Sequence, residues 1–320
     1  MKDLSIIIPV YNSENTIIEL VDRLIDVCRN SRSFEVILVN DGSSDNSYKI
    51  CKELSSRNKF IKFISFHKNH GQANAILAGL SEAEGNTCVV MDDDLQHSPE
   101  EIPQLLNVLK QGFDFVFGIS KKPQQDFLRV LASKLSFKTS DLMLDKPKDL
   151  YHSSFIAVKY DVVREIVKYD GPYPHISGLI FRVTRNGTNV IVNYLPRKSG
   201  KSQYILSKLI RLWLNSFTMF SIIPLRIASY SGVVISLVGF VVLLVLVIQK
   251  LLYGKFLTGW VSVIGSILLF SGIQLLALGL LGEYVGRIFM LLNKTPQYTI
   301  KEKYNCSCIE EESLMSNVSK

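Results

Sequence analysis

Two long stretches without a charged residue constrain the fold of this chain more than any other feature. They cover residues 227–249 and 257–282, and no Asp or Glu occurs between Asp170 and Glu283. A helix needs about 20 apolar residues to cross the hydrocarbon core of a bilayer, so each stretch is long enough. A pair of buried core helices is the alternative, but such helices rarely exceed about 20 residues without a charge. We therefore predict two transmembrane helices.

The short connection KLLYGKF makes the two stretches an antiparallel hairpin, so both flanks lie on the same side of the membrane. Only two basic residues, Lys250 and Lys255, lie in this connection. The flanks carry many more: Arg197, Lys198, Lys201, Lys208, Arg211, Arg226, Arg287, Lys294, Lys301 and Lys303. The positive-inside rule then places residues 1–198 and the tail, 283–320, in the cytoplasm. The first apolar run, residues 4–10, is too short for a signal peptide and contains Pro9.

The segment 199–226 connects the polar part of the chain to the first predicted span. Its apolar residues share one helical face, with Lys208 and Arg211 on the other, which predicts interfacial helices lying along the membrane surface. A soluble core helix is the alternative. The net charge of +7 comes largely from the membrane-flanking region, and this favours anionic lipid over nucleic acid as its partner.

The first 198 residues alternate short apolar runs with segments of helical periodicity. The predicted strands are 4–10, 34–40, 60–66, 86–92 and 113–119. The predicted helices are 14–30, a helix from about Ser44, 71–85 closed by Gly85, and 98–112. This alternation predicts an α/β domain with a mostly parallel sheet and helices on both faces. Ligands of such sheets bind outside the carboxyl ends of the strands.

Polar motifs fall at those strand ends. PVYN follows the first strand, NDGSSD the second, HKNHGQ the third and DDDLQ the fourth, so four loops are expected to converge on one crevice. Asp41 can accept hydrogen bonds from a nucleobase, and Tyr11 can stack on one. The alternatives are an ordinary turn and helix cap for residues 41–45 and simple packing for Tyr11.

The aspartate triplet at residues 92–94 is hard to explain structurally. Adjacent carboxylates raise one another's pKa and destabilise a site unless a cation neutralises them. In an extended segment Asp92 and Asp94 face one side and Asp93 the other. A Mg²⁺ or Mn²⁺ ion held by carboxylates and substrate phosphates would resolve the repulsion, and Gln96 can add an amide oxygen. A helix N-terminus accounts for Ser98 and Pro99 but not for the aspartates.

Four motifs, SIIIPVYNSEN, VILVNDGSSDNS, NHGQANAILAGL and MDDDLQHSPEEIP, resemble the successive motifs of family 2 glycosyltransferases. These enzymes have a GT-A-type fold and bind a nucleotide-sugar through a D-x-D motif and a divalent metal. The later PRKSGKSQYILSKLIRLWLNSF and SIIPLR, followed by two spans, resemble the polyprenyl-phosphate glycosyltransferases. That group includes dolichyl-phosphate mannose synthase and the bacterial undecaprenyl-phosphate glucose and aminoarabinose transferases. The resemblance covers residues 1 to about 295.

The resemblance implies a role for each matching residue. Pro9, Tyr11 and Asp41 would contact the base and ribose, with Asn12 and Gln72 as further donor-binding candidates. Asp92 and Asp93 would lie against the ribose and diphosphate, and the metal ligands would be Asp94 and Gln96, with Asp92 as a third. Arg197, in R-x-x-G-x-S-x-Y, would clamp phosphate, with Lys201, Ser202 and Tyr204 nearby. Asp94, Arg197 and Lys201 are the candidate catalytic residues.

The chain departs from its relatives at two places. Many relatives have Asn-Glu-Glu after the tyrosine, where this chain has Asn12, Ser13 and Glu14. Many also have an aspartate followed by Phe-Arg where this chain has Ser154 and Ile156, which removes a proposed catalytic base. Asp149 is a substitute candidate.

Transfer without a protein base is chemically reasonable, because a phosphate monoester with a second pKa near 6 is mostly dianionic at neutral pH. We expect in-line attack of a polyprenyl phosphate, guided by Arg197, Lys201 and either Arg129 or Lys134, on the anomeric carbon, with inversion. The resemblance to bacterial members favours a UDP-sugar, undecaprenyl phosphate, an inner-membrane location, a role in cell-envelope glycan or lipopolysaccharide, and association into a homo-oligomer. The alternatives are a catalytically silent nucleotide-sugar-binding adaptor and a polysaccharide synthase, whose Q-x-x-R-W motif is absent from the sequence.

Overall fold

A computed structural model describes residues 2–29, 33–120, 150–172, 174–195, 259–293 and 296–306, with scattered residues between 230 and 252. The chain divides into two units. The first comprises residues 1–141, 145–204 and 296–320, and the second comprises 142–144 and 205–295. The final segment of the chain therefore belongs to the same unit as its beginning. The predicted interfacial helices, residues 199–226, lie outside the described residues, and the first predicted span is described only at scattered positions.

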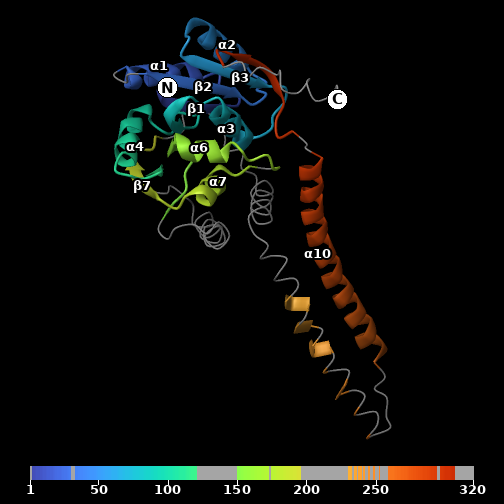
Figure 1. The fold of residues 1–320 in the computed structure, drawn as a ribbon. Helices are drawn as coiled ribbons and strands as arrows, with labels where there is room; N and C mark the ends of the chain where they lie inside the picture. Colours follow the sequence, from blue (N-terminus) through green and yellow to red (C-terminus); the bar gives the residue numbers. More distant parts are fainter. Residues whose placement is uncertain are drawn as a thin grey trace, which may run out of the picture. The chain divides into compact units, whose positions relative to one another are not determined.

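The first unit is built on an eight-stranded sheet with the order β7-β5-β6-β4-β1-β2-β3-β8 (Figure 1). The strands are β1 (Lys2–Val10), β2 (Phe34–Asn40), β3 (Ile61–Phe66), β4 (Gly85–Val90), β5 (Phe115–Ser120), β6 (Ile156–Lys159), β7 (Gly187–Val192) and β8 (Ile300–Tyr304). β1 pairs in parallel with β2 and β4, β2 with β3, and β5 with β7. Only β6 and β8 run antiparallel to their neighbours in the described sheet. This confirms the predicted mostly parallel sheet.

Helices cover both faces of the sheet because the central strands are apolar on both sides. The helices are α1 (Ile17–Cys28), α2 (Ser47–Arg57), α3 (Gln72–Ser81), the 3₁₀ helix η1 (Pro99–Glu101), α4 (Ile102–Leu109), α6 (Tyr160–Ile166) and α7 (Ile176–Val183). Alternate residues of β1 point to opposite faces. Ile6 and Ile8 join the core formed with α1 and α4. Ile7 lies against α3 on the other face, so close that a Cβ on Gly79 would come within 2.5 Å of it.

The end of α3 differs from the sequence prediction. The helix was predicted to run to Gly85, but it ends at Ser81, and Gly85 is the first residue of β4. A Cβ at Gly85 would lie 2.5 Å from the backbone nitrogen of Ser5 on the neighbouring β1. This glycine is therefore needed for the close approach of two strands, and it is not a helix terminator.

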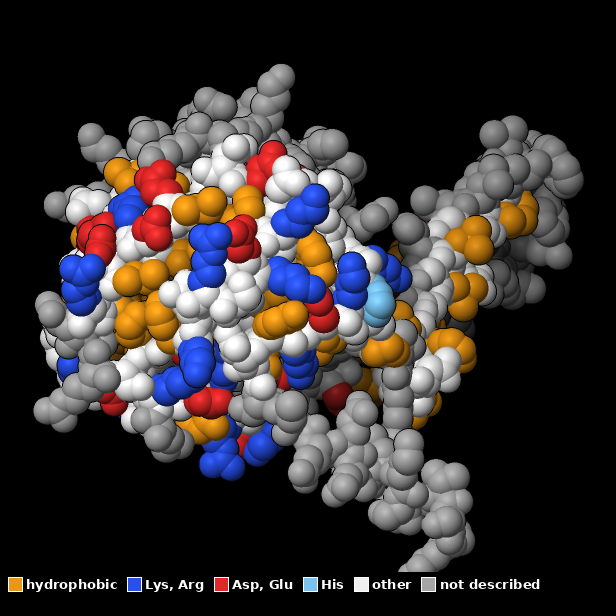
Figure 2. Space-filling view, turned by 90° about the horizontal axis from the view of Figure 1, so that it is seen from above, with side chains coloured by type: hydrophobic (Ala, Val, Ile, Leu, Met, Phe, Trp, Pro, Cys, Tyr) orange, Lys and Arg blue, Asp and Glu red, His pale blue; other side chains and the backbone are white. Residues whose placement is uncertain are grey.

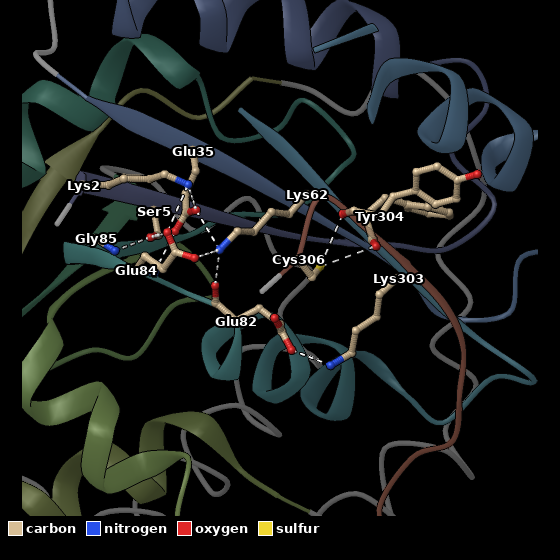
Figure 3. A network of polar contacts seen from close by, with 11 residues as sticks. Lys2, Ser5, Glu35, Lys62, Glu82, Glu84, Gly85, Lys303, Tyr304 and Cys306 are labelled. Carbon is tan, nitrogen blue, oxygen red and sulfur yellow. Dashed lines mark hydrogen bonds and ion pairs between the residues drawn. The ribbon is translucent and has the colours of Figure 1, made fainter. Parts of the chain in front are cut away.

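A buried ionic network lies at the amino ends of the strands, opposite the polar loops (Figure 3). Glu35 accepts hydrogen bonds from Lys2 at 2.6 Å and Ser5 at 2.5 Å, and it pairs with Lys62 at 3.0 Å. Both Glu35 and Lys62 are almost completely buried. Charges in such a place are tolerated only when they are paired and hydrogen-bonded. The network therefore ties together the starts of β1, β2 and β3.

The second unit contains the long helix α10 (Trp260–Leu292). It has 33 residues, or about 50 Å at 1.5 Å per residue. Its part Phe270–Leu292 is long and apolar enough to cross a membrane, judged by length and composition. Large apolar side chains such as Leu275, Leu278 and Val285 are exposed on it. By contrast, Figure 2 shows charged side chains of both signs interspersed over one face of the first unit.

Candidate functional site

The structure joins the polar loops at the carboxyl ends of β1, β2, β3 and β4 through direct hydrogen bonds. The backbone N–H of Tyr11, after β1, donates to Asp93 Oδ2, after β4, at 3.0 Å. The N–H of Asn12 donates to the Ser43 hydroxyl at 3.1 Å. The Gln72 amide, at the start of α3, donates to Asp92 Oδ1 at 2.6 Å. Four segments far apart in the sequence thus form one site.

Asp93 fixes the loop that follows β1. Besides the N–H of Tyr11, its Oδ2 accepts a hydrogen bond from the Ser13 hydroxyl. Burial raises the pKa of Asp93 to about 6, although these two hydrogen bonds lower it, and the neighbouring Asp92 and Asp94 raise it further. Through these two hydrogen bonds Asp93 shapes the loop that carries Tyr11.

Asp92 faces a different set of partners. Its carboxylate accepts hydrogen bonds from Gln72 Nε2 and from Ser154 Oγ, both at 2.6 Å, and its Oδ2 lies 3.8 Å from His97 Nδ1. Burial raises the pKa of Asp92 and lowers that of His97. Its effect on both pKa values outweighs the electrostatic attraction between the two side chains. His97 is stacked on Phe155, with ring centroids 5.1 Å apart. Ser154 therefore lies inside the site.

Leu95 turns the chain sharply between Asp94 and Gln96. Its φ is +60°, in the left-handed region that a leucine rarely adopts, and its side chain is 1% exposed in the core. Because the Leu95 side chain is buried in the core, the chain keeps this strained conformation. The turn separates Asp94 and Gln96 from the core. Such strain is typical of functional loops.

Gln96 connects the aspartate loop to the segment after β7. Its Oε1 accepts a hydrogen bond from the Tyr194 hydroxyl at 2.9 Å, and its backbone carbonyl accepts one from the N–H of Leu195, also at 2.9 Å. His97 and Tyr194 form an isolated β-bridge. The chain that continues toward Arg197 therefore starts directly beside Gln96.

Asp41 lies at the end of β2 and is 2% exposed. Its two oxygens accept the backbone N–H groups of His70 at 2.6 Å and Gly71 at 2.8 Å. Burial raises the pKa of Asp41, and these two hydrogen bonds oppose the rise. Gly42 has a φ of +65°, and a Cβ there would lie 2.5 Å from the Lys68 carbonyl carbon. Glycine thus allows the loops after β2 and β3 to touch.

The donor atoms beside the turn at Leu95 suit a hard divalent cation. Asp92, Asp94 and Gln96 offer carboxylate and amide oxygens, the ligand type that Mg²⁺ and Mn²⁺ prefer. Among the residues that the structure describes, no three His, Cys, Asp or Glu side chains form a metal site by themselves. Burial is the main cause of the raised pKa of Asp92, and a bound cation would favour its charged form. The residues fit an ion that is completed by substrate oxygens.

The remaining predicted residues fall into two groups. Pro9 lies in β1, two residues beyond the last pair between β1 and β4, and Tyr11 is 43% exposed at the loop surface. The Asn12 side chain accepts the N–H of Ser44 at 2.8 Å. The other predicted residues lie outside the described part of the chain: Arg129, Lys134, Asp149, Arg197, Lys201, Ser202 and Tyr204.

Sequence reasoning missed several contributors to the site. His97 directly follows Gln96, so its place in the same motif was a usable signal. Tyr194 reaches the site through β7, and Ser13 was noted only as a departure from the relatives. His70 contributes through its backbone N–H to Asp41, and a backbone donor leaves no mark in a sequence.

Comparison with known proteins decides the family. The model of the family described as Glycosyl transferase family 2 matches residues 5–167, which contain every loop of the site described above except the segment after β7. The chain belongs to this family. It is therefore a glycosyltransferase, as the motifs at the strand ends predicted.

Individual relatives extend the match to nearly the whole glycosyltransferase chain. The uncharacterized glycosyltransferase YkcC of Bacillus subtilis (strain 168) is 34% identical over 302 residues, 94% of each chain. The undecaprenyl-phosphate 4-deoxy-4-formamido-L-arabinose transferase of Proteus mirabilis (strain HI4320) is 32% identical over 306 residues, again 94% of each chain. These matches include the long apolar helix as well as the first unit, which contains the site and is the catalytic unit of the chain.

Solved structures agree on the fold. Glucosyl-3-phosphoglycerate synthase from Mycobacterium tuberculosis, in complex with Mn²⁺, uridine-diphosphate-glucose and phosphoglyceric acid, superposes with a TM-score of 0.51. The two proteins are 17% identical, and the match covers 68% of this chain and 78% of that one. At this identity the likeness shows a shared GT-A-type fold.

Proposed function

We propose that this glycosyltransferase moves a sugar from a nucleoside-diphosphate sugar to undecaprenyl phosphate, supplying a lipid-linked sugar for modification of the cell envelope. The observation that carries the proposal is the match of 94% of both chains with the undecaprenyl-phosphate transferase of Proteus mirabilis. A match of that extent includes the site and the apolar helix alike. It favours a lipid-phosphate acceptor over a polysaccharide chain and over a silent adaptor.

The donor would bind across the loops after β1, β2 and β4. Tyr11, exposed at the end of β1, would stack on the base, and Asp41 would accept a hydrogen bond from it through lone pairs left beside the His70 and Gly71 N–H groups. Pro9, Asn12 and Gln72 would be further contacts of the donor. Asp93 holds the Tyr11 loop in place for this contact. A UDP-sugar is the proposed donor.

Asp92, Asp94 and Gln96 would hold Mg²⁺ or Mn²⁺ together with the donor diphosphate. When bound, such an ion supplies Lewis-acid stabilisation of the departing diphosphate. The protein keeps these three proposed ligands in place by other means. Asp92 is fixed by Gln72 and Ser154, Asp94 accepts the backbone N–H of Gln96, and the Gln96 amide is fixed by Tyr194. Ser154 thus provides a hydroxyl that orients the Asp92 carboxylate.

The acceptor phosphate would be held by Arg197 and Lys201. Support comes from chain length: the N–H of Leu195 is bonded to Gln96, and Arg197 follows two residues later, at most about 7 Å along the chain. The dianionic phosphate oxygen would attack the anomeric carbon while the bond from that carbon to the nucleoside diphosphate breaks, which inverts the configuration. No protein base is needed, because the attacking phosphate carries no proton to remove.

The path of the chain supports a membrane hairpin. It leaves the first unit at residue 204 and re-enters it at residue 296, so any membrane crossings between these points must be even in number. α10 would be one crossing, ending in a cytoplasmic tail that re-enters the catalytic unit, and residues 227–249 would be the other. We propose an inner-membrane protein with its catalytic unit in the cytoplasm and with residues 199–226 at the membrane surface.

The experiment is a screen of nucleotide-sugars. Membranes containing the full chain are incubated with Mn²⁺, undecaprenyl phosphate and one radiolabelled UDP- or GDP-sugar at a time, and the label in the chloroform-extractable lipid is counted. We expect one donor to give label that depends on added undecaprenyl phosphate. Label that appears only in water-soluble or polymeric material would overturn the proposal.

A further inference from the structure

The chain returns from α10 to the catalytic unit through residues 296–300, which we call the return segment. β8 pairs antiparallel with β3, and Ile300 lies opposite Phe66, the last residue of β3. Because β8 runs in the opposite direction, the residues that precede it lie at the carboxyl end of β3. The return segment therefore adjoins loop 67–71, whose N–H groups bind Asp41.

Thr299 contacts this loop through three polar groups. Its carbonyl accepts the N–H of His67 at 3.1 Å, its own N–H donates to His70 Nε2 at 3.3 Å, and its hydroxyl lies 3.2 Å from the same nitrogen. A nitrogen that accepts from a backbone N–H must be unprotonated. Burial, reinforced by Lys68, lowers the pKa of His70, which keeps the imidazole in the neutral form that these contacts require.

Neighbouring side chains fix the return segment on both sides. Tyr298 stacks on Phe66 with centroids 4.9 Å apart, and the His70 ring meets Phe66 edge-on at 5.6 Å. On the other side, the Gln297 amide donates to the backbone carbonyls of Tyr169 at 3.0 Å and Gly171 at 2.7 Å. The segment therefore bridges two loops of the catalytic unit.

His70 is the point at which the return segment meets the donor site. Its ring is held by Thr299, while its backbone N–H donates to Asp41 Oδ1. The next N–H, that of Gly71, donates to Asp41 Oδ2. A shift of the His70 ring would therefore move the two donors that orient the buried Asp41 carboxylate. One residue therefore links the return segment to the proposed base-binding group.

We propose that the return segment orients Asp41 for nucleotide binding, with Thr299 and His70 as positioning residues that act through the backbone of loop 67–71. The inference rests on the proposed function, because it takes Asp41 as a contact of the donor nucleotide. It gives the chain after the membrane helix a role in donor affinity in addition to its role as a strand of the sheet.

If β8 had only a structural role, any substitution that weakens its docking would lower donor affinity. A substitution at Lys303 serves as the control. Lys303, four residues after Thr299, pairs with Glu82 at 2.5 Å near the amino end of the sheet (Figure 3). Removing that pair weakens the docking of β8 without touching loop 67–71. Lys303→Met thus reports on the docking of β8 alone. His70→Phe reports on the contact between Thr299 and His70 while keeping an aromatic ring against Phe66.

The test measures UDP binding to the full-length protein in detergent with Mn²⁺, by titration calorimetry, alongside the melting temperature. We expect His70→Phe and Thr299→Val to raise the Kd for UDP, the former by about tenfold, which corresponds to about 1.4 kcal/mol and to the loss of one positioned hydrogen bond. His70→Gln, whose amide oxygen can accept from Thr299, should recover part of the affinity. The KM for undecaprenyl phosphate should change by less than about twofold, as expected if the acceptor is bound elsewhere.

The possible results separate the two claims. Wild type that binds neither UDP nor GDP would contradict the proposed function itself. Wild type that binds, with Asp41→Asn impaired but His70→Phe and Thr299→Val within twofold of wild type, would overturn the inference alone. An equal loss of affinity in Lys303→Met would also overturn it, since general docking would then explain the effect. If His70→Phe does not fold, Thr299→Val decides on the same criteria.

Discussion

At the scale of single residues, three consecutive aspartates have separate environments. Asp93 is bonded to the N–H of Tyr11 and the hydroxyl of Ser13, whereas Asp92 is bonded to Gln72 and Ser154. The alternation expected of an extended segment already separated Asp93 from the other two. The partners follow from the sheet, which brings the loops after β1 and β4 together. Charge repulsion between these carboxylates is offset by hydrogen-bond donors from three other segments of the chain.

Leu95 offers a test of strain against burial. Leu95→Gly would remove the cost of a left-handed residue, about 1 kcal/mol, but it would also delete a side chain that is 1% exposed, at a cost of about 3 kcal/mol or more. Burial wins, so we expect a net loss of about 2 kcal/mol and a lower melting temperature. Thermal unfolding of the purified variant checks this, and a variant more stable than wild type would show that strain dominates the turn.

At the scale of helices and strands, the sequence predicted the elements whose apolar residues follow a clear pattern along the chain. β1 to β5 were expected from short apolar runs flanked by turns. Each was found within two or three residues of its predicted bounds. β6 to β8 were not expected. β6 has four residues, β7 is only half-buried at the sheet edge, and β8 carries three charged residues in five. Short or polar strands depend on partners that are distant in the sequence.

The same reasoning explains what was found of the site. Asp92, Asp94, Gln96, Asp41 and Tyr11 closely follow strands, so the topology predicts that they lie at the same edge of the sheet. Ser154 and Tyr194 arrive through β6 and β7, and no local pattern marks them. The error at Gly85 has a related cause: a glycine after a helix is a common terminator, and only the neighbouring Ser5 shows that this one belongs to a strand.

The network at the amino ends of β1, β2 and β3 should make stability depend on pH. Burial by itself raises the pKa of Glu35, but hydrogen bonds from Lys2, Ser5, the N–H of Glu84 and Lys62 lower it overall. A carboxyl whose pKa is lower in the folded state contributes stability above its unfolded pKa, about 4.3, and this contribution disappears as the pH falls through the folded value.

We therefore expect Glu35→Gln to be less stable than wild type at pH 7, with the difference shrinking below about pH 4. Lys62→Met should cost about 3 kcal/mol or more at pH 7, because it leaves Glu35 buried with one cation fewer. Melting temperatures measured from pH 3 to 8 check both. A difference between wild type and Glu35→Gln that stays constant over this range would contradict the assignment.

At the scale of the whole molecule, the path of the chain predicts its topology. The catalytic unit contains both the residues before 204 and those after 296, so a membrane hairpin would place only the connection 250–256 outside. In a background with Cys306 and Cys308 changed to Ser, we expect Lys255→Cys to react with a membrane-impermeant maleimide in intact cells. Lys110→Cys, on the surface of the catalytic unit, should react only after lysis. Labelling of Lys110→Cys in intact cells would contradict the topology.

The central claim is that the loop 92–96 and its cation promote transfer of a sugar to a lipid phosphate. Its most direct measurement is the rate of label transfer from the donor to undecaprenyl phosphate by the purified full-length protein, with and without Mn²⁺. We expect Asp94→Ala, and wild type in EDTA, to lose at least about 100-fold in rate, while the matched variant Asp22→Ala on the exposed face of α1 keeps the wild-type rate. Full transfer by Asp94→Ala in EDTA would contradict the account.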